Sequence, residues 1–183
     1  KFDNKFFSKK LQTNIIKYEA LSLVIFDFIK KHNIEIEKKF SVLVNSGPGS
    51  FSGIRIALAI AKGMQLVKKL NIYGYNTFML NAAPYLKKKE KLISIIRTNN
   101  FYYFSKINFG NKLSFTLPKK LESNYLETNN FLIVIPEEIK NDNIFHNIDK
   151  KNVCISEFNP KNVDILIENN LLENKLIKPL YLS

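Results

Sequence analysis

The sequence predicts an α/β protein, and three observations lead to this prediction. Short apolar runs of strand length, such as residues 40–44 and 72–75, alternate with longer apolar segments of helical length. A predicted helix over about residues 53–70 lies between these two runs, and the order strand, helix, strand is typical of parallel pairing. The chain has 183 residues, 45% of them apolar and 24% charged, so it can bury a core and lacks the composition of a disordered protein.

The first forty residues are expected to contain the end of a hairpin and one long helix. In residues 2–7, phenylalanines stand on both sides of a short polar turn, which indicates the second half of a hairpin. Asn14 is placed to cap a helix that runs to about residue 31. In residues 15–29, 11 of 15 positions are apolar, more than a helix needs when it rests on one core with its other face in water.

The second half of the chain predicts a hairpin, a further strand and a last helix. The runs 92–96 and 101–107 alternate around a Thr-Asn-Asn turn, which favours a hairpin. Residues 131–135 form an apolar run that ends at a proline, and residues 162–174 have a helical pattern. Three consecutive lysines at 87–89 fit a boundary between two lobes, expected to cover residues 1–83 and 84–183, and they fit a solvated helix end equally well.

The formal charge of +12 is weak evidence for a nucleic-acid partner. Lysine supplies 26 of the 28 basic residues, and Asn and Ile occur 23 times each, which indicates a compositional bias of the whole chain. The single cysteine, Cys154, excludes a disulfide scaffold and a cysteine zinc site. No apolar run reaches the roughly 18–20 residues of a membrane span, and residues 1–10 lack the apolar core of a signal peptide. We therefore expect a cytoplasmic protein without a membrane partner.

The densest local signal is the glycine loop, residues 47–55, between a predicted strand and a predicted helix. A P-loop would need Lys and then Ser or Thr after the last glycine, but Ile54 and Arg55 follow it. The glycine spacing is one residue too long for a dinucleotide fingerprint, and the centre of Gly49–Gly53 is not the serine of a nucleophile elbow. The residues of this motif are Gly47, Pro48, Gly49, Ser50, Phe51, Ser52, Gly53 and Arg55.

No acid, histidine or cysteine occurs between Lys38 and Lys89, so the glycine loop has no neighbouring residue for acid–base, metal or nucleophilic chemistry. We expect no catalytic residue, no metal and no cofactor. Backbone N–H groups at the start of a helix, followed by Arg55, would suit an anion or a partner's carbonyl. The alternative is a tight turn with a purely structural role. Arg55 is one of only two arginines in a lysine-rich chain, which favours a role for its planar group.

The loop, followed by an alanine- and glycine-containing helix, closely resembles the signature G-P-G-S-F-T-G-L-R-I-G-x-x-x-A-K-G of the TsaB (YeaZ) family. Residues 73–77 look like the V-G-V-S-T strand end of that family, and the C-terminal residues 178–183 resemble its closing P-x-Y-L-R. The hairpin occupies the place of its D-A-R-x-G-E-V-Y segment, with Arg97 and Tyr102 at the matching positions. Three departures are Ile95 for the Asp, Ser183 for the terminal Arg, and Lys17 for the usual His.

The resemblance implies an actin-like, RNase H-type duplicated fold (the ASKHA fold) with a degenerate second lobe. It implies a non-catalytic subunit that pairs with the homologous catalytic subunit TsaD and the ATPase TsaE. That complex places a threonylcarbamoyl group on the adenosine beside the anticodon of tRNA, so this subunit would meet tRNA indirectly. The first strand of the family has no counterpart in the sequence given, and we expect it to be missing from the chain.

Two apolar helices indicate how such a subunit would bind its partner. Together they would form half of a helix bundle completed by the partner, or by a second copy when the chain is isolated. Small residues at helical spacing form two strips, 57 with 61 and 59 with 63, and we expect one strip to face the partner. The expected interface residues are Tyr18, Leu21, Ile25, Ile56, Ala57, Ala59, Ile60, Ala61, Gly63 and Met64.

Three alternatives remain open from the residues alone. Both apolar helices would be buried within one subunit if the chain acted by itself. An actin-fold ATPase or kinase relative would need phosphate-binding glycines in both lobes, and the second half offers only Gly110. A tRNA-binding accessory protein would use the lysines at 87–89 and the aromatic run 101–104.

Overall fold

The computed structural model describes residues 7, 9, 20–98, 100–110, 113–122, 130–146, 148–157, 159, 161–174 and 177–182. The expected hairpin end at 2–7 is described at Phe7 alone, and the first part of the expected helix from Asn14, with Tyr18, lies outside these residues. The chain forms two compact units: unit 1 holds Lys1–Gly74 and Glu173–Pro179, and unit 2 holds Tyr75–Leu172 and Leu180–Ser183. The expected division at residue 83 differs from this one, because residues 77–85 pack in unit 2 and a C-terminal segment returns to unit 1.

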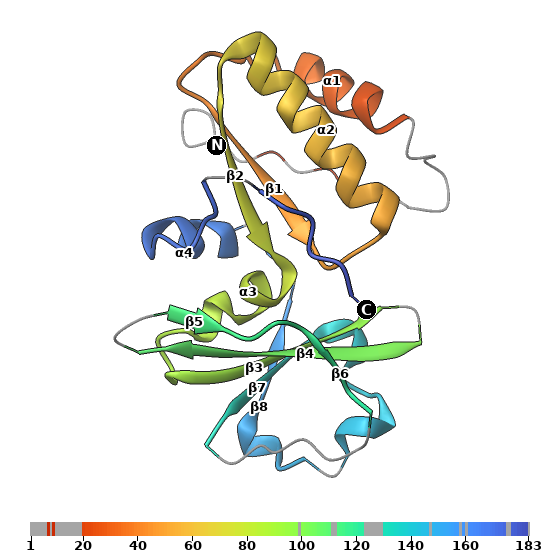
Figure 1. Cartoon of the computed structure of the whole chain (residues 1–183), viewed down its shortest axis with the longest axis vertical. Helices are drawn as coiled ribbons and strands as arrows, with labels where there is room; N and C mark the ends of the chain where they lie inside the picture. The colour runs from red at the N-terminus through yellow and green to blue at the C-terminus, as the bar shows by residue number, and fades with distance from the viewer. Residues whose placement is uncertain are drawn as a thin grey trace. The chain divides into compact units, whose positions relative to one another are not determined.

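Unit 1 is a strand–helix–strand motif with an additional helix (Figure 1). The strands β1 (Ser41–Gly47) and β2 (Asn71–Asn76) form a two-stranded sheet, and their arrows run in the same direction, as the sequence predicts. Helix α2 (Phe51–Lys68) connects them and packs on β1, while α1 (Leu21–Lys31) lies beside α2. The core of this unit consists of Val44, Ile54, Leu58, Ala61, Ile72 and Ile177.

Local signals account for the bounds of α2. The helix begins at Phe51, two residues earlier than predicted, because the Ser50 side chain caps it by accepting a hydrogen bond from the Gly53 backbone N–H at 3.4 Å. It ends where Lys69 takes a left-handed conformation with φ 54°, and the Lys69 N–H bonds to the Gln65 carbonyl at 2.7 Å. Strand β1 (Ser41–Gly47) extends three residues beyond the apolar run 40–44 from which it is predicted.

Unit 2 contains a mixed sheet with the strand order β5-β4-β3-β7-β8, with β6 pairing β4. The predicted hairpin is confirmed, because β3 and β4 pair in antiparallel fashion from Lys91 opposite Asn108 to Thr98 opposite Phe101. The predicted strand near 131–135 is confirmed as β7, which is parallel to both β3 and β8. The strands are β3 (Lys91–Thr98), β4 (Phe101–Phe109), β5 (Leu113–Phe115), β6 (Lys119–Lys120), β7 (Leu132–Pro136) and β8 (Val153–Ser156).

Both faces of this sheet are covered, and neighbouring residues of β3 therefore enter different cores. Leu92 packs with α3 (Thr77–Ala82), the 3-10 turn η2 (Ala83–Tyr85) and α4 (Asn162–Glu168). Ile93 packs with residues of η3 (Glu137–Ile139) and η4 (Asn143–Phe145), and η5 (Lys150–Asn152) follows η4 along the chain. Burial on both faces explains why four of the five residues 92–96 are apolar and why the fifth, Ser94, is buried as well.

The predicted helix over 162–174 is too long: α4 ends at Glu168. Asn170 takes a left-handed conformation with φ 55°, which ends the helical path. The chain then extends, and Glu173 pairs with Gly74 of β2 through two backbone hydrogen bonds of 2.8 Å. None of the helices in the described ranges combines the length and apolar character that a membrane span requires.

Candidate functional site

The glycine loop begins where β1 ends, and its first half is part of the folded interior. Gly47 has a φ of 110°, a conformation that favours glycine, and its N–H donates to the Asn45 side-chain oxygen at 2.8 Å. Ser46, Gly47 and Pro48 are buried, whereas the residues from Gly49 to Ser52 are exposed. The loop is therefore a tight strand-to-helix turn whose second half faces outward.

Two backbone donors at the start of α2 are engaged within the loop itself. The Gly53 N–H bonds to the Ser50 hydroxyl at 3.4 Å, and the Ile54 N–H bonds to the Ser50 carbonyl at 2.9 Å. The first of these bonds satisfies one of the helix-terminal donors that an anion would need to reach, and the second is the first hydrogen bond of the helix itself. This favours the structural interpretation of the loop over a phosphate cradle.

Two exposed side chains of the loop lie together at the start of α2. The Arg55 guanidinium carbon is 5.0 Å from the centroid of the Phe51 ring, a distance at which a cation and an aromatic face attract each other. Both residues are exposed. They place a positive charge and an aromatic ring together on the exposed surface of the first turn of α2.

The structure separates the two strips of small residues on α2. Ala61 is 2% exposed in the core of unit 1, and Ala57 packs against the same core. The expectation that Ala61 faces a partner is therefore wrong, because this residue fills the space under the chain's own helix. Ala59 and Gly63 are exposed, and a Cβ at Gly63 would meet nothing within 4 Å.

An apolar groove runs between α1 and α2, and we call it the α1–α2 groove. Its volume is about 320 Å³. The expected residues Ile60, Gly63 and Met64 line it, while Leu21, Ile25 and Ile56 are partly buried without lining it. The remaining lining residues are Ser22, Phe26, Ile36, Val67 and Lys68.

Sequence reasoning missed the apolar residues at the end of α2. Leu66 is 81% exposed and Val67 is 78% exposed, and on α1 Leu23 and Phe26 are exposed as well. A sequence signal for these residues exists. Leu66 and Val67 stand between Gln65 and the two lysines at 68–69, so two large apolar residues interrupt a polar segment. Large apolar side chains exposed on two neighbouring helices are typical of a surface that another protein covers.

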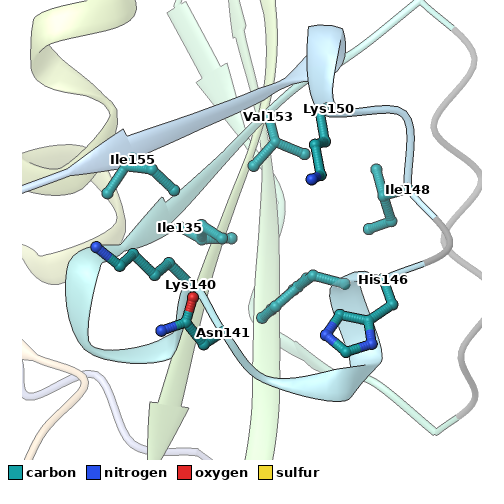
Figure 2. A pocket seen from close by; sticks show the side chains of 9 residues that line it. Ile135, Lys140, Asn141, His146, Ile148, Lys150, Val153 and Ile155 are labelled. Carbon is teal, nitrogen blue, oxygen red and sulfur yellow. The ribbon is translucent and has the colours of Figure 1, made fainter.

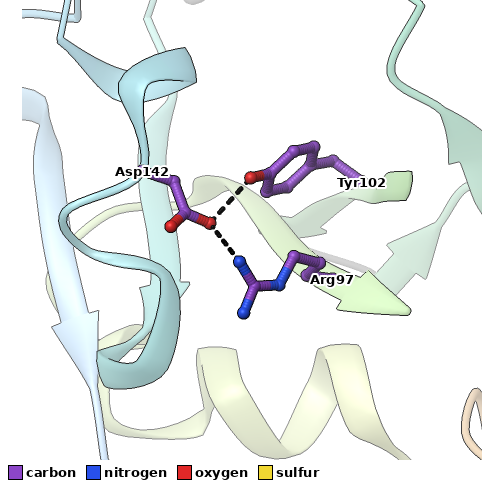
Figure 3. A network of polar contacts seen from close by, with 3 residues as sticks. All are labelled: Arg97, Tyr102 and Asp142. Atoms are coloured by element: carbon purple, nitrogen blue, oxygen red, sulfur yellow. Dashed lines mark hydrogen bonds and ion pairs between the residues drawn. The ribbon is translucent and has the colours of Figure 1, made fainter. Parts of the chain in front are cut away.

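A cluster of three polar side chains joins the β3–β4 hairpin to the segment after β7 (Figure 3). One carboxylate oxygen of Asp142 accepts from the Arg97 guanidinium at 2.9 Å and from the Tyr102 hydroxyl at 2.7 Å. Arg97 and Tyr102 stand directly opposite each other in the β3–β4 pair, so both reach the same carboxylate. Burial raises the pKa of Tyr102, and its hydrogen bond to Asp142 raises it further.

The cluster links two residues that the sequence resemblance singled out with one that it did not. Asp142 lies 40 residues from Tyr102 in sequence, and no local pattern marks it. Within the described ranges, no three His, Cys, Asp or Glu side chains gather in a group that could hold a metal ion. The ion pair and the hydrogen bond are arranged to hold the segment after β7 against the hairpin.

Comparison with known proteins identifies the family of this mixed α/β chain. The chain belongs to the TsaD family, described as tRNA N6-adenosine threonylcarbamoyltransferase, whose sequence pattern matches residues 18–170. It is 33% identical over 79 residues to the tRNA threonylcarbamoyladenosine biosynthesis protein TsaB of Buchnera aphidicola subsp. Baizongia pistaciae, covering 42% of this chain and 36% of that protein. The TsaB of Buchnera aphidicola subsp. Schizaphis graminum is 34% identical over 58 residues, covering 32% of this chain and 28% of that protein.

These alignments span about a third of the curated relatives' own length. The fold is similar over a longer stretch to YeaZ from Pseudomonas aeruginosa, with a TM-score of 0.60 and 13% identity, covering 90% of this chain and 84% of that chain. The resemblance to the TsaB (YeaZ) family that the glycine loop indicates is thereby confirmed, and so is the mixed α/β fold.

Proposed function

We propose that this chain is a TsaB-like subunit in the N6-threonylcarbamoyladenosine modification of tRNA, and that it supports the reaction without catalysing it. Its membership of the TsaD family and its TsaB relatives support the pathway. The stretch between Lys38 and Lys89, which includes the glycine loop and α2, contains no acid, histidine or cysteine. A chain with this site supports binding better than it supports bond-making chemistry.

The single observation that carries the binding role is the exposed apolar surface of α1 and α2. Burying one side chain of the size of Leu66 contributes about 1.5–3 kcal/mol to association. Leu23, Phe26, Leu66 and Val67 are all exposed, so covering them together would supply a large favourable term. The α1–α2 groove between them offers a recess into which side chains of a partner helix would insert.

The partner that fits this surface is a homologous TsaD-like catalytic subunit, which would add two helices to α1 and α2 and complete a bundle. Ala59 and Gly63 present little side-chain volume at the exposed side of α2 and permit close approach of another helix. A TsaE-like ATPase would join this pair, and tRNA would be met through the complex. The isolated chain would use the same surface to form a homodimer.

The test is co-purification with a TsaD-like subunit, using two leucines of nearly equal exposure. Leu66 on α2 is 81% exposed and Leu117 in unit 2 is 75% exposed, so aspartate at either position does little harm to folding. We expect Leu66→Asp to weaken association at least tenfold and Leu117→Asp to leave it unchanged. Equal binding by both variants would contradict the assignment of the surface to α2.

A second pair of variants separates association from folding. We expect Ala59→Asp to leave unit 1 folded, with only a small fall in melting temperature from the lower helix propensity of Asp, and to lose the partner, because Ala59 is exposed. Ala61→Asp would place a charge in the core of unit 1 and unfold that unit, because Ala61 is 2% exposed. Circular dichroism and pull-down on the same samples distinguish the two results, and normal pull-down with Ala59→Asp would count against the proposal.

A further inference from the structure

Unit 2 contains a pocket that the proposed function does not use, and we call it the β7–β8 pocket. Its volume is about 410 Å³, and it lies over the ends of β7 and β8 beside η3, η4 and η5 (Figure 2). Its apolar floor belongs to the core on this face of the sheet. The floor residues are Ile135, Phe145, Ile148, Val153 and Ile155.

The rim of the pocket carries hydrogen-bond donors and positive charge. Lys150 points from η5 into the pocket beside Val153, and Asn141 and His146 stand on the opposite side (Figure 2). Lys140 also lines the pocket and pairs with Glu137. Among the described lining residues none is acidic. Lys140 is paired with Glu137, so Lys150 is the described lining lysine outside that ion pair.

The acidic residues near the pocket are directed to other partners. Asp142 accepts from Arg97 and Tyr102 at 2.9 and 2.7 Å, and Asp149 accepts from the Lys151 backbone N–H at 3.0 Å. These bonds hold the carboxylates to the hairpin and to the start of η5. The described lining itself therefore presents the ammonium groups of Lys140 and Lys150, while the flanking carboxylates bond to groups outside the pocket.

The wall of the pocket is braced from the hairpin. Asp142 follows the lining residue Asn141, and its bonds to Arg97 and Tyr102 tie this segment to β3 and β4. The ring of Phe145 lines the pocket and meets the Tyr102 ring edge-on, with centroids 5.8 Å apart. One wall of the pocket is therefore fixed to the hairpin by a polar and an aromatic contact.

We propose that the β7–β8 pocket binds a small organic anion, whose apolar body lies on the isoleucine floor and whose charged group meets Lys150. An apolar floor with a few convergent donors is the usual construction of a small-molecule site. An ionised oxygen acceptor bonds more strongly to an ammonium group than a neutral one does. The proposal concerns unit 2 and is independent of the partner surface on α1 and α2.

The probe is 1-naphthyl phosphate, with 1-naphthol as the same body without charge and inorganic phosphate as the charge without a body. Binding is followed in the full chain by NMR of isoleucine methyl groups. We expect 1-naphthyl phosphate to shift the signals of Ile135, Ile148 and Ile155, and to bind at least tenfold more tightly than either control. Shifts at Ile36 and Ile60 instead would place the probe in the α1–α2 groove and overturn the proposal.

Two neighbouring lysines of η5 provide a matched pair of variants. Lys150 and Lys151 are both exposed and basic, but only Lys150 lines the pocket. We expect Lys150→Glu to weaken binding of 1-naphthyl phosphate at least tenfold and Lys151→Glu to change it less than twofold. Equal losses of affinity in the two variants would show a response to net charge alone and would refute the site. So would binding of 1-naphthol as tight as that of 1-naphthyl phosphate, or no binding of 1-naphthyl phosphate at millimolar concentration.

Discussion

Replacing Gly74 by alanine tests how the returning C-terminal segment packs on unit 1. A Cβ at Gly74 would lie 2.8 Å from Cγ2 and 3.2 Å from Cγ1 of Ile177, and 3.3 Å from the Glu173 carboxylate. Ile177 is 8% exposed in the core of unit 1 and is β-branched, so its atoms have little freedom to move aside. We therefore expect Gly74→Ala to displace Ile177 or the strand that carries Gly74.

Overpacking of a well-filled core typically costs about 1–3 kcal/mol of unfolding free energy. For a chain of this size, that loss corresponds to a fall in melting temperature of about 2–12 °C. Urea denaturation followed by far-UV circular dichroism would measure the free energy. Because the chain has two compact units, a signal that reports unit 1 separately, such as the NMR resonance of Val44, should be followed alongside.

A double-mutant cycle identifies the clashing atoms. Ile177→Ala removes both Cγ atoms and costs about 2–4 kcal/mol by itself. In that background, Gly74→Ala should cost about 0.5 kcal/mol or less, because the new methyl group then has space. If Gly74→Ala costs the same in both backgrounds, Ile177 is not the obstacle and the account of this contact is wrong.

Three further predictions concern single polar groups. Asn76→Ala should lower the free energy of unfolding by about 1–2 kcal/mol, because the buried Asn76 side chain accepts from the Met79 N–H at 2.8 Å and caps α3. Asn76→Ser should recover part of this loss, and urea titration of both variants would measure it. Asp142→Ala should lower the free energy of unfolding by about 1–2 kcal/mol, because Arg97 and Tyr102 both lose their partner. Adding Tyr102→Phe should then cost little more, and additive losses would argue against a shared carboxylate. Glu173→Gln should stabilise the protein at pH 7 but not at pH 3. Although Glu173 as a whole is exposed, burial of its carboxyl raises the pKa above 4.5, so wild-type stability falls as pH rises through this region. Solvent screening keeps the gain to about a few tenths of a kcal/mol, and a variant that is relatively more stable at pH 3 would contradict the sign.

The sequence by itself determined the elements whose signals are local. The β-branched and aromatic run before a glycine predicts β1, and the alternation around a Thr-Asn-Asn turn predicts the β3–β4 hairpin. The spacing of the glycines predicts a tight turn between a strand and a helix, and it carries the family resemblance. Each of these signals depends on residues within about ten positions of one another, where chain geometry limits the possible arrangements.

Only the tertiary structure decided which surfaces face the chain's own core. Helical periodicity places Ala57 with Ala61 and Ala59 with Gly63, but the position of β1 determines that Ala61 is buried and Ala59 is exposed. The same holds for Asp142, which meets Arg97 across 45 residues of sequence, and for the segment from Glu173 that returns to β2. Such contacts join residues that no local pattern relates, because they form only when distant segments are brought together by burial of the cores between them.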